Sequence, residues 1–182
     1  NIDKYSSIIL SDYGKGVLTT NLTKEIIKIA NKNNIKVLVD PKGKDYSKYK
    51  GSYTLTPNKK EAMEATNIDI KDESSLIEAL KSLKTQCELE VSLITLSEQG
   101  IAIFDDELTI KPTVAREVYD VTGAGDTVIA SIAFALGNNL DIKDAIYFAN
   151  LAAGVVVGKI GSATTTLDEI YEYEYSLHKS NS

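Results

Sequence analysis

Short apolar runs alternate with helical stretches along this sequence, and that alternation limits the possible fold more than any other feature. Each predicted strand is a short apolar run, and each predicted helix carries apolar residues three or four apart. Strands that alternate with helices predict an α/β fold: a mainly parallel sheet with helices on both faces. The predicted strands cover residues 8–10, 36–39, 53–55 and 91–96, a hairpin covers 101–111, and helices begin near residues 20, 57, 74, 125, 141 and 167.

The first predicted helix carries further expectations. Thr20 or Asn21 is expected to cap its amino end, because side-chain oxygens accept hydrogen bonds from the free N–H groups of a first turn. Asn33-Asn34 is expected to end it. The apolar residues expected to share one of its faces are Leu22, Ile26, Ile29 and Ala30.

Polar and glycine-bearing segments follow the predicted strands. In parallel α/β sheets, ligands bind outside the carboxyl ends of the strands. The segments in question are 12–16, 40–43, 56–61 and 95–100. Their shared placement predicts a binding site at that edge of the sheet.

The formal net charge of −6 limits the partners of this chain. Nucleic acids and anionic membranes attract surfaces rich in Lys and Arg, so we expect neither as a partner. An anionic substrate would need cations gathered locally or supplied by a metal. The single cysteine, Cys87, allows no disulfide within the chain, is expected to be a small apolar filler, and fits a reducing, cytoplasmic location.

The segment Asp120-Val-Thr-Gly-Ala-Gly-Asp126 combines small residues with a carboxylate before a long apolar helix. At Gly123, Ala124 and Gly125 backbone N–H groups can approach an anion closely, and the helix dipole adds to the attraction. Asp126 falls in the first turn, where a carboxylate can accept the proton of a substrate hydroxyl that attacks a phosphate. A tight turn followed by a favourable first-turn charge is an equally good interpretation of the spacing alone.

Asn58 and Glu61 lie three residues apart at a predicted helix start. Their oxygen atoms suit Mg²⁺-bound water and a nucleotide phosphate. The same spacing is also that of a capping box, in which the two residues satisfy each other's backbone N–H groups. Spacing alone favours the cap.

Other segments offer weaker candidates and some exclusions. The hydroxyls of Thr95 and Ser97 can donate to phosphate oxygens, although a plain turn is the commoner meaning of such residues. Lys15 and Lys42 each follow a strand and can meet an anionic group, although single lysines are more often solvated.

The sequence has no G-x-x-x-x-G-K-[ST] loop, no G-x-G-x-x-G after a strand and no Cys/His cluster. These absences argue against a P-loop enzyme, a dinucleotide oxidoreductase and a zinc site.

Together these motifs resemble those of the ribokinase-like (PfkB-type) carbohydrate kinases. The segment 120–126 looks like the C-terminal signature of that family, Asn58-x-x-Glu61 like its Mg²⁺/phosphate motif, and 95–100 like its next phosphate loop. The order of these motifs and the number of residues between them agree with the family pattern across nearly the whole chain. The resemblance implies a ribokinase-like fold, ATP as phosphate donor and Mg²⁺ as cofactor.

A closer resemblance is to kinase domains that act on D-glycero-β-D-manno-heptose 7-phosphate, often joined to an adenylyltransferase in one chain. It implies phosphorylation at C1 to heptose 1,7-bisphosphate, in ADP-heptose and lipopolysaccharide-core biosynthesis. The segments that carry it are Ser-Asp-Tyr-Gly-Lys-Gly (11–16), Asp-Pro-Lys-Gly (40–43), Leu-Thr-Pro-Asn (55–58), Glu-Val-Tyr-Asp (117–120) and Ala-Ala-Gly-Val-Val-Val-Gly-Lys (152–159).

The resemblance also implies roles by position. Asp126 would be the catalytic base, and Gly123, Ala124 and Gly125 would form the anion hole. Asp120 and Thr122 resemble a loop that binds a monovalent cation such as K⁺. The residues implied to serve MgATP are Asn58, Lys59, Lys60, Glu61 (also a metal ligand), Thr95, Ser97 (where many relatives have Gly), Gly100, Asn150 and Ala153. The residues implied to meet the sugar or its phosphate are Asp12, Lys15 and Lys42.

Members of this family run to about twice the length of this chain, within the range of large α/β domains. We therefore expect the chain, which begins at Asn1 rather than Met, to be the C-terminal, ATP-binding portion of a kinase domain. Its expected partners are the missing N-terminal segment, which supplies much of the sugar site, and a second copy of the chain. A related kinase for another sugar or nucleoside and a non-catalytic nucleotide-binding or assembly module remain alternatives, the latter because truncation exposes a sheet edge.

Overall fold

The computed structural model describes residues 2–115 and 118–179. The chain divides into two units, Asn1–Leu96 with Ala102–Ile110, and Ser97–Ile101 with Lys111–Ser182. The helices and strands of 2–111 are η1 (Ile2–Lys4), β1 (Ser7–Ser11), α1 (Thr20–Lys32), β2 (Lys36–Asp40), η2 (Ser47–Tyr49), β3 (Thr54–Leu55), α2 (Lys59–Thr66), α3 (Glu73–Cys87), β4 (Ser92–Thr95), η3 (Ser97–Gln99), β5 (Ile101–Phe104) and β6 (Leu108–Lys111). They are followed by α4 (Ala124–Gly137), α5 (Ile142–Val157) and α6 (Leu167–Lys179).

A parallel sheet in the order β1-β2-β3 forms the frame of the first unit. Its register pairs Ser11 with Asp40, so that β1 and β2 end at the same edge. The N–H of Thr95 donates to Pro57 O at 3.0 Å, and Asn58 and Thr95 form a parallel bridge beyond β3. The parallel pairing therefore continues from β3 towards β4, and the predicted α/β fold is confirmed.

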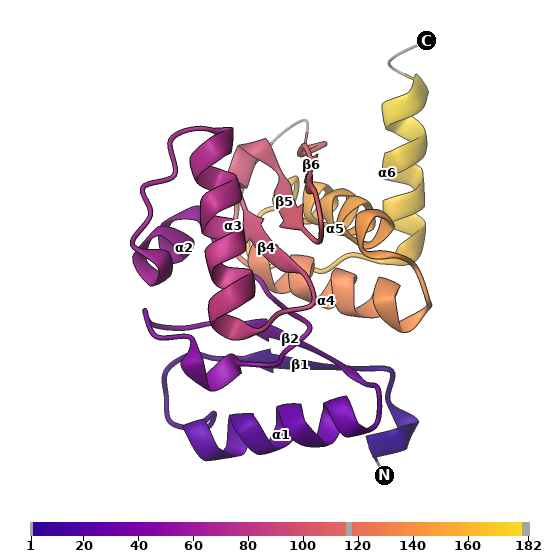
Figure 1. The fold of residues 1–182 in the computed structure, drawn as a ribbon. Helices are drawn as coiled ribbons and strands as arrows, with labels where there is room; N and C mark the ends of the chain where they lie inside the picture. Colours follow the sequence, from indigo (N-terminus) through magenta and orange to yellow (C-terminus); the bar gives the residue numbers. More distant parts are fainter. Residues whose placement is uncertain (1, 116–117, 180–182) are drawn as a thin grey trace. The chain divides into compact units, whose positions relative to one another are not determined.

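The core of the first unit lies where the helices cover this sheet. Val37, Leu38, Val39 and Leu55 are completely buried, as expected for strands covered on both faces. In Figure 1, α1 runs alongside β1 and β2, and α2 and α3 lie next to each other. The hairpin of β5 and β6 also forms as predicted, because the two neighbouring strands are joined by three residues, too few for a parallel crossover.

The predicted cap of α1 is wrong by one residue. Its predicted face is borne out in part, because Ala30 is buried and Ile26 packs against the core. Thr19, not Thr20 or Asn21, accepts the hydrogen bond from Leu22 N–H, at 3.3 Å. Leu22 and Ile29 are 45% and 46% exposed. The residues that α1 buries are Thr23, Ile27 and Ala30. The helix offers two adjacent apolar stripes, and packing against the sheet, which the helical period does not encode, decides between them.

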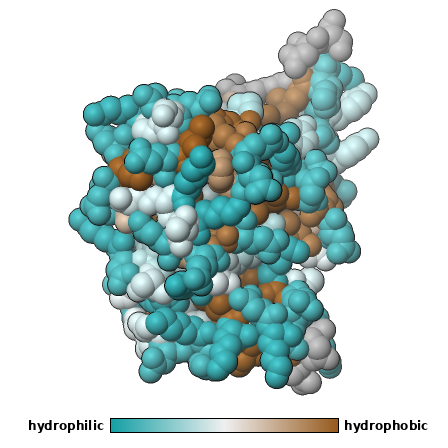
Figure 2. All heavy atoms as spheres, in the orientation of Figure 1, coloured by the Kyte–Doolittle hydropathy of each residue, from teal (hydrophilic) through white to brown (hydrophobic). Residues whose placement is uncertain are grey.

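Polar side chains nevertheless predominate on the outer side of α1. Figure 2 keeps the orientation of Figure 1, and the visible surface over α1 is mainly hydrophilic.

None of the described helices is long and apolar enough to cross a membrane.

Three helices, α4, α5 and α6, make up most of the second unit, and all three were predicted. Asp141 caps α5 by accepting from Asp144 N–H at 2.8 Å. A Cβ atom on Gly154 would lie 2.9 Å from the Tyr173 ring, so glycine allows α6 to pack closely on α5. The Tyr173 hydroxyl donates to Val114 O at 2.8 Å and fixes the segment before α4 to the same packing.

Cys87 has the role expected of a small apolar filler. It is 1% exposed within the core of the first unit. Burial raises the pKa of its thiol to about 11, so the reactive thiolate is scarce at neutral pH.

Gly100 occupies a position that only glycine can fill. Its φ of +95° lies in a region that side chains disfavour, and a Cβ atom there would lie 2.1 Å from Lys111 O. The atoms in the way belong to the backbone, so no side-chain rotation relieves the clash.

We expect Gly100→Ala to lower the free energy of unfolding by about 2–4 kcal/mol, from backbone strain and overpacking together. Gly161→Ala is the matched control in the same unit, because Gly161 has a φ of +77° but nothing within 4 Å of its Cβ position. Strain alone should cost the control about 1–2 kcal/mol. Urea unfolding measures the free energy of unfolding of each variant. Equal losses of stability in the two variants would contradict the steric explanation.

Candidate active site

The amino end of α4 differs from those of the helices that carry side-chain caps. Gly123 holds the cap position with φ +80° and ψ 0°, and it provides no side-chain acceptor. By contrast, α1, α2, α3 and α5 each have a cap side chain that accepts from the first turn. The positive end of the α4 dipole is therefore not neutralised by a cap residue.

The backbone of this turn is open to a ligand. Apart from the adjoining residues and the backbone of α4 itself, no heavy atom lies within 4 Å of the Cβ positions of Gly123 and Gly125. The N–H of Ala124 donates to Val121 O at 3.1 Å and closes the turn. Of the three predicted anion-hole amides, that of Ala124 is thus already engaged in this conformation.

Asp126 is exposed at the edge of an open cleft in the second unit. The cleft has a volume of about 560 Å³. Gly123, Asp126 and Thr127 line it from α4, and the rings of Phe134 and Phe148, 5.9 Å apart, give it an apolar wall. The carboxylate proposed as a base is thus accessible from solvent and stands beside the open turn of the same helix.

Asp120 and Thr122 form a compact turn before α4. Thr122 N–H donates to Asp120 Oδ1 at 2.8 Å. The hydrogen bonds from Thr122 lower the pKa of Asp120, which keeps the carboxylate ionised and suited to a cation. The N–H of Tyr119 donates to Val157 O at 2.8 Å and ties the turn to the end of α5. Glu117, which belongs to the predicted motif here, lies outside the described residues.

Asn58 and Glu61 form the capping box of α2 that their spacing favoured. Glu61 N–H donates to Asn58 Oδ1 and Asn58 N–H donates to Glu61 Oε2, each at 3.0 Å. The second carboxylate oxygen of Glu61, Oε1, lies 3.9 Å from the Lys42 ammonium. Lys59 is half-buried and Lys60 is exposed. The cap leaves one charged oxygen of Glu61 for another role.

The described residues contain no cluster of three or more His, Cys, Asp or Glu side chains that would hold a metal by themselves. Mg²⁺ needs no such cluster, because it usually keeps several waters and is bound through one or two carboxylates together with substrate phosphates. Glu61 Oε1 fits that requirement.

The remaining candidates for nucleotide contact are placed as follows. Ser97 has a φ of +53°, a left-handed conformation that favours glycine, and its carbonyl accepts from Gly100 N–H at 3.0 Å. Asn150 is buried and donates to Lys111 O at 2.8 Å and to Pro112 O at 3.2 Å. Thr95 and Ala153 are half-buried. Contact of these residues with ATP stays a prediction.

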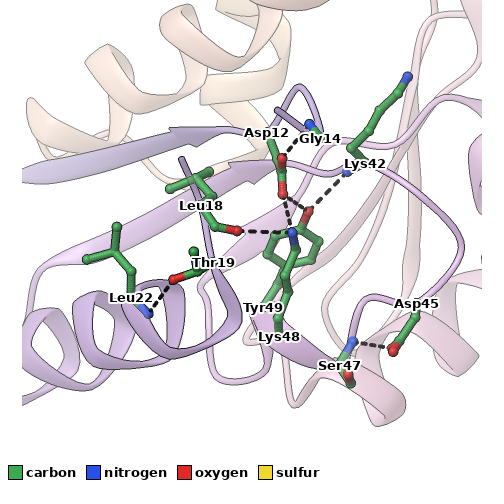
Figure 3. A network of polar contacts seen from close by, with 10 residues as sticks. All are labelled: Asp12, Gly14, Leu18, Thr19, Leu22, Lys42, Asp45, Ser47, Lys48 and Tyr49. Carbon is green, nitrogen blue, oxygen red and sulfur yellow. Dashed lines mark hydrogen bonds and ion pairs between the residues drawn. The ribbon is translucent and has the colours of Figure 1, made fainter. Parts of the chain in front are cut away.

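Asp12, predicted to meet the sugar, is 5% exposed and already engaged (Figure 3). Its carboxylate accepts from Tyr49 OH at 2.6 Å, from Gly14 N–H at 2.7 Å and from the Lys48 ammonium. Lys15 is exposed, and the side chain of Lys42 is 59% exposed. A direct contact between Asp12 and a substrate stays a prediction, but the geometry favours an indirect role.

Sequence reasoning missed Lys48 and Tyr49. They lie in a polar stretch between β2 and β3, where the pattern indicates only a loop. Nothing local marks a tyrosine that is completely buried or a lysine that binds a carboxylate 36 residues away. It also missed the apolar wall of the cleft, because Phe134 and Phe148 look like ordinary core residues of α4 and α5.

Relatives in sequence match the whole chain. The protein named "Bifunctional protein HldE" of Aliarcobacter butzleri is 87% identical over 182 residues, which are 100% of this chain and 38% of that protein. The protein of the same name from Sulfurimonas denitrificans is 65% identical, again over 100% of this chain and 38% of the relative. The chain thus spans well under half the length of these curated relatives.

Solved structures agree on the fold. Arabidopsis thaliana ribokinase complexed with ribose and ATP superposes with a TM-score of 0.84 at 20% identity, covering 94% of this chain and 56% of that one. Escherichia coli phosphofructokinase-2 in complex with potassium gives a TM-score of 0.80 at 18% identity, over 94% and 57%. At these identities the likeness concerns the fold alone, and it confirms the ribokinase-like architecture.

One family model accounts for nearly all of the sequence. The model described as "pfkB family carbohydrate kinase" matches residues 2–169, a range that includes both the capping box of α2 and the open turn of α4. With the identity to its relatives along the entire length, this match shows that the chain belongs to the pfkB family of carbohydrate kinases.

Proposed function

We propose that this chain provides the ATP-binding and catalytic part of a kinase that phosphorylates the C1 hydroxyl of D-glycero-D-manno-heptose 7-phosphate. The product is heptose 1,7-bisphosphate. The observation that carries the proposal is the exposed Asp126 carboxylate beside the uncapped turn of α4, on an open cleft. The choice of sugar is supported by the relatives named as bifunctional HldE proteins.

In this mechanism Asp126 accepts the proton of the attacking C1 hydroxyl. The sugar oxygen forms a bond to the γ-phosphorus, the bond from that phosphorus to the bridging oxygen breaks, and ADP leaves with the electron pair. General-base assistance of this kind contributes about 10²–10⁴ in rate. The exposure of Asp126 suits a group that must meet a substrate hydroxyl.

The open turn of α4 stabilises the charge on the phosphoryl group in transfer. The helix dipole and the amide of Gly125 act on that charge without needing to reorganise. One such donor is worth about 3–4 kcal/mol in the transition state. Gly123 permits the approach, because its left-handed conformation holds the turn with no side chain above it.

Two further groups are proposed to hold cations. Glu61 Oε1 would bind Mg²⁺, directly or through water, and Mg²⁺ would neutralise charge on the ATP phosphates. The Asp120–Thr122 turn would bind a monovalent cation such as K⁺, consistent with the lowered pKa of Asp120. Lys15 and Lys42 are proposed to bind the phosphate of the sugar.

Asp126→Asn should abolish transfer and spare nucleotide binding. A suitable host is a chimera in which this chain replaces the matching 182-residue segment of the Aliarcobacter butzleri relative. We expect kcat to fall by about 10²–10⁴, because the amide cannot accept the proton. The affinity of the chimera for MgATP, measured by calorimetry, should stay unchanged.

The matched control is Asp144→Asn, which removes an exposed first-turn carboxylate from α5 instead of α4. It should leave kcat unchanged. Near-normal turnover by the Asp126 variant, or an equal loss in both variants, would overturn the assignment of the base.

Glu61→Gln should separate the cap from the metal role. Glutamine also completes a capping box, so the free energy of unfolding should change by less than about 0.5 kcal/mol. The Mg²⁺ concentration that gives half-maximal turnover should rise, because the charged oxygen is lost. Asn58→Ala keeps the Glu61 charge but removes the cap, and it should lower the free energy of unfolding by about 1 kcal/mol. If Glu61→Gln leaves the Mg²⁺ dependence unchanged, Glu61 serves only the helix.

A further inference from the structure

The Asp12 carboxylate is the centre of a polar network that the proposed reaction does not yet use (Figure 3). Its oxygens are occupied by the Lys48 ammonium, by Tyr49 OH at 2.6 Å and by Gly14 N–H at 2.7 Å. Burial opposes ionisation of Asp12, but the bonds from Lys48 and Tyr49 prevail and lower its pKa below the ordinary value. Asp12 is therefore an ionised, enclosed acceptor with little capacity left for a substrate.

The network connects three separate segments at the carboxyl edge of the sheet. Gly14 N–H fixes the loop that follows β1, which also carries Lys15. Tyr49, from η2, donates to Asp12 and accepts from Lys42 N–H at 3.1 Å, which fixes the loop that follows β2. Lys48 adds a bond to Leu18 O at 3.3 Å, further along the first loop. One carboxylate thus holds the backbone of both lysine-bearing loops.

The two loops also touch through side chains. A Cβ atom on Gly14 would lie 3.7 Å from Lys42 Cγ, so the stem of Lys42 passes next to the residue before Lys15. Figure 3 shows Lys42 extending beside Gly14 and away from the Asp12 carboxylate. The only ion pair of Lys42 among the described residues is the 3.9 Å contact with Glu61.

Charge balance favours an anion at these lysines. The negative charge of Asp12 is compensated by Lys48, whose side chain is 22% exposed. Asp12 therefore does not neutralise Lys15 or Lys42, and the only carboxylate that the ion pairs of the described residues place near Lys42 is that of Glu61, at 3.9 Å. Asp45, the carboxylate beside η2, is engaged locally, because it accepts from Ser47 N–H at 2.9 Å.

We propose that Asp12, Tyr49 and Lys48 are positioning residues that hold Lys15 and Lys42 together as a binding site for the phosphate group of the acceptor sugar. The proposal deepens the proposed function and rests on it for the identity of the sugar phosphate. It differs from the sequence-based expectation, in which Asp12 itself meets the substrate. It adds two residues, Lys48 and Tyr49, that carry no sequence motif.

A neighbouring tyrosine supplies a matched control. Tyr46 and Tyr49 pack with ring centroids 5.9 Å apart, and both are buried. The Tyr46 hydroxyl is buried and has no hydrogen-bond partner among the described residues, whereas that of Tyr49 joins Asp12 to Lys42. Tyr→Phe at each position removes the same atom, but only one of the two changes cuts the network.

The test is a titration of the ¹⁵N-labelled chain with inorganic phosphate, followed at the backbone amides of 14–16 and 42–43. We expect these amides to shift. Tyr49→Phe removes both hydrogen bonds of that hydroxyl, to Asp12 and from Lys42 N–H, and should weaken phosphate binding about threefold to tenfold. Tyr46→Phe should bind like the unchanged chain. Lys15→Gln should weaken binding through loss of charge.

Asp12→Asn separates positioning from simple electrostatics. Removing a negative charge near an anion would strengthen phosphate binding if only the local field mattered. Loss of the network should instead weaken it, to an extent similar to Tyr49→Phe. Stronger binding by Asp12→Asn, equal binding by the two tyrosine variants, or no shift at these amides would each overturn the proposal.

Kinetics in the chimera give an independent readout. Tyr49→Phe should raise KM for heptose 7-phosphate about threefold to tenfold, while kcat and KM for ATP stay constant. A purely structural defect would lower kcat or change both KM values. If the unsubstituted chimera does not phosphorylate heptose 7-phosphate, the proposed function fails, and the phosphate titration still decides the role of the network.

Discussion

Parallel pairing of β1, β2 and β3 is the constraint on which the rest of the first unit depends. The pairing of Ser11 with Asp40 and of Val39 with Leu55 makes the three strands end at one edge. Beyond that edge the pairing continues for one more bond on each side, from Asp12 N–H to Asp40 O at 3.0 Å and from Thr56 N–H to Val39 O at 2.9 Å. The loops that carry candidate ligand-binding residues therefore start from backbone that the sheet already holds.

The chain uses two helix starts in opposite ways. At α2, Asn58 and Glu61 satisfy each other's backbone groups, and the helix is stabilised with one charged oxygen left over. At α4, glycine replaces a capping side chain, and the dipole of the first turn meets an open cleft. The first arrangement favours stability and the second favours an anionic ligand, because a cap residue would occupy the space that a phosphate needs.

The buried charge of Asp12 shows why distant contacts matter to this edge. Desolvation offsets much of the attraction in a buried ion pair, and the role proposed above for the pair of Asp12 with Lys48 is to fix the geometry of the loops. Here one carboxylate collects donors from residues 2, 36 and 37 positions away in the sequence. In α1, too, packing against the sheet selects Thr23 and Ile27 for burial and leaves Leu22 and Ile29 exposed, although all four are compatible with a helix.

The sequence by itself determined the order of strands and helices, the α/β class, the capping-box spacing of Asn58 and Glu61, and the position of Asp126 in a first turn. These features depend on neighbours within a few residues, where periodicity and capping preferences act. Only the tertiary structure decided which stripe of α1 is buried, that Asp12 is enclosed rather than open to substrate, and that Gly100 faces the backbone at Lys111. Those outcomes depend on which distant segments meet, and local pattern carries no information about such meetings.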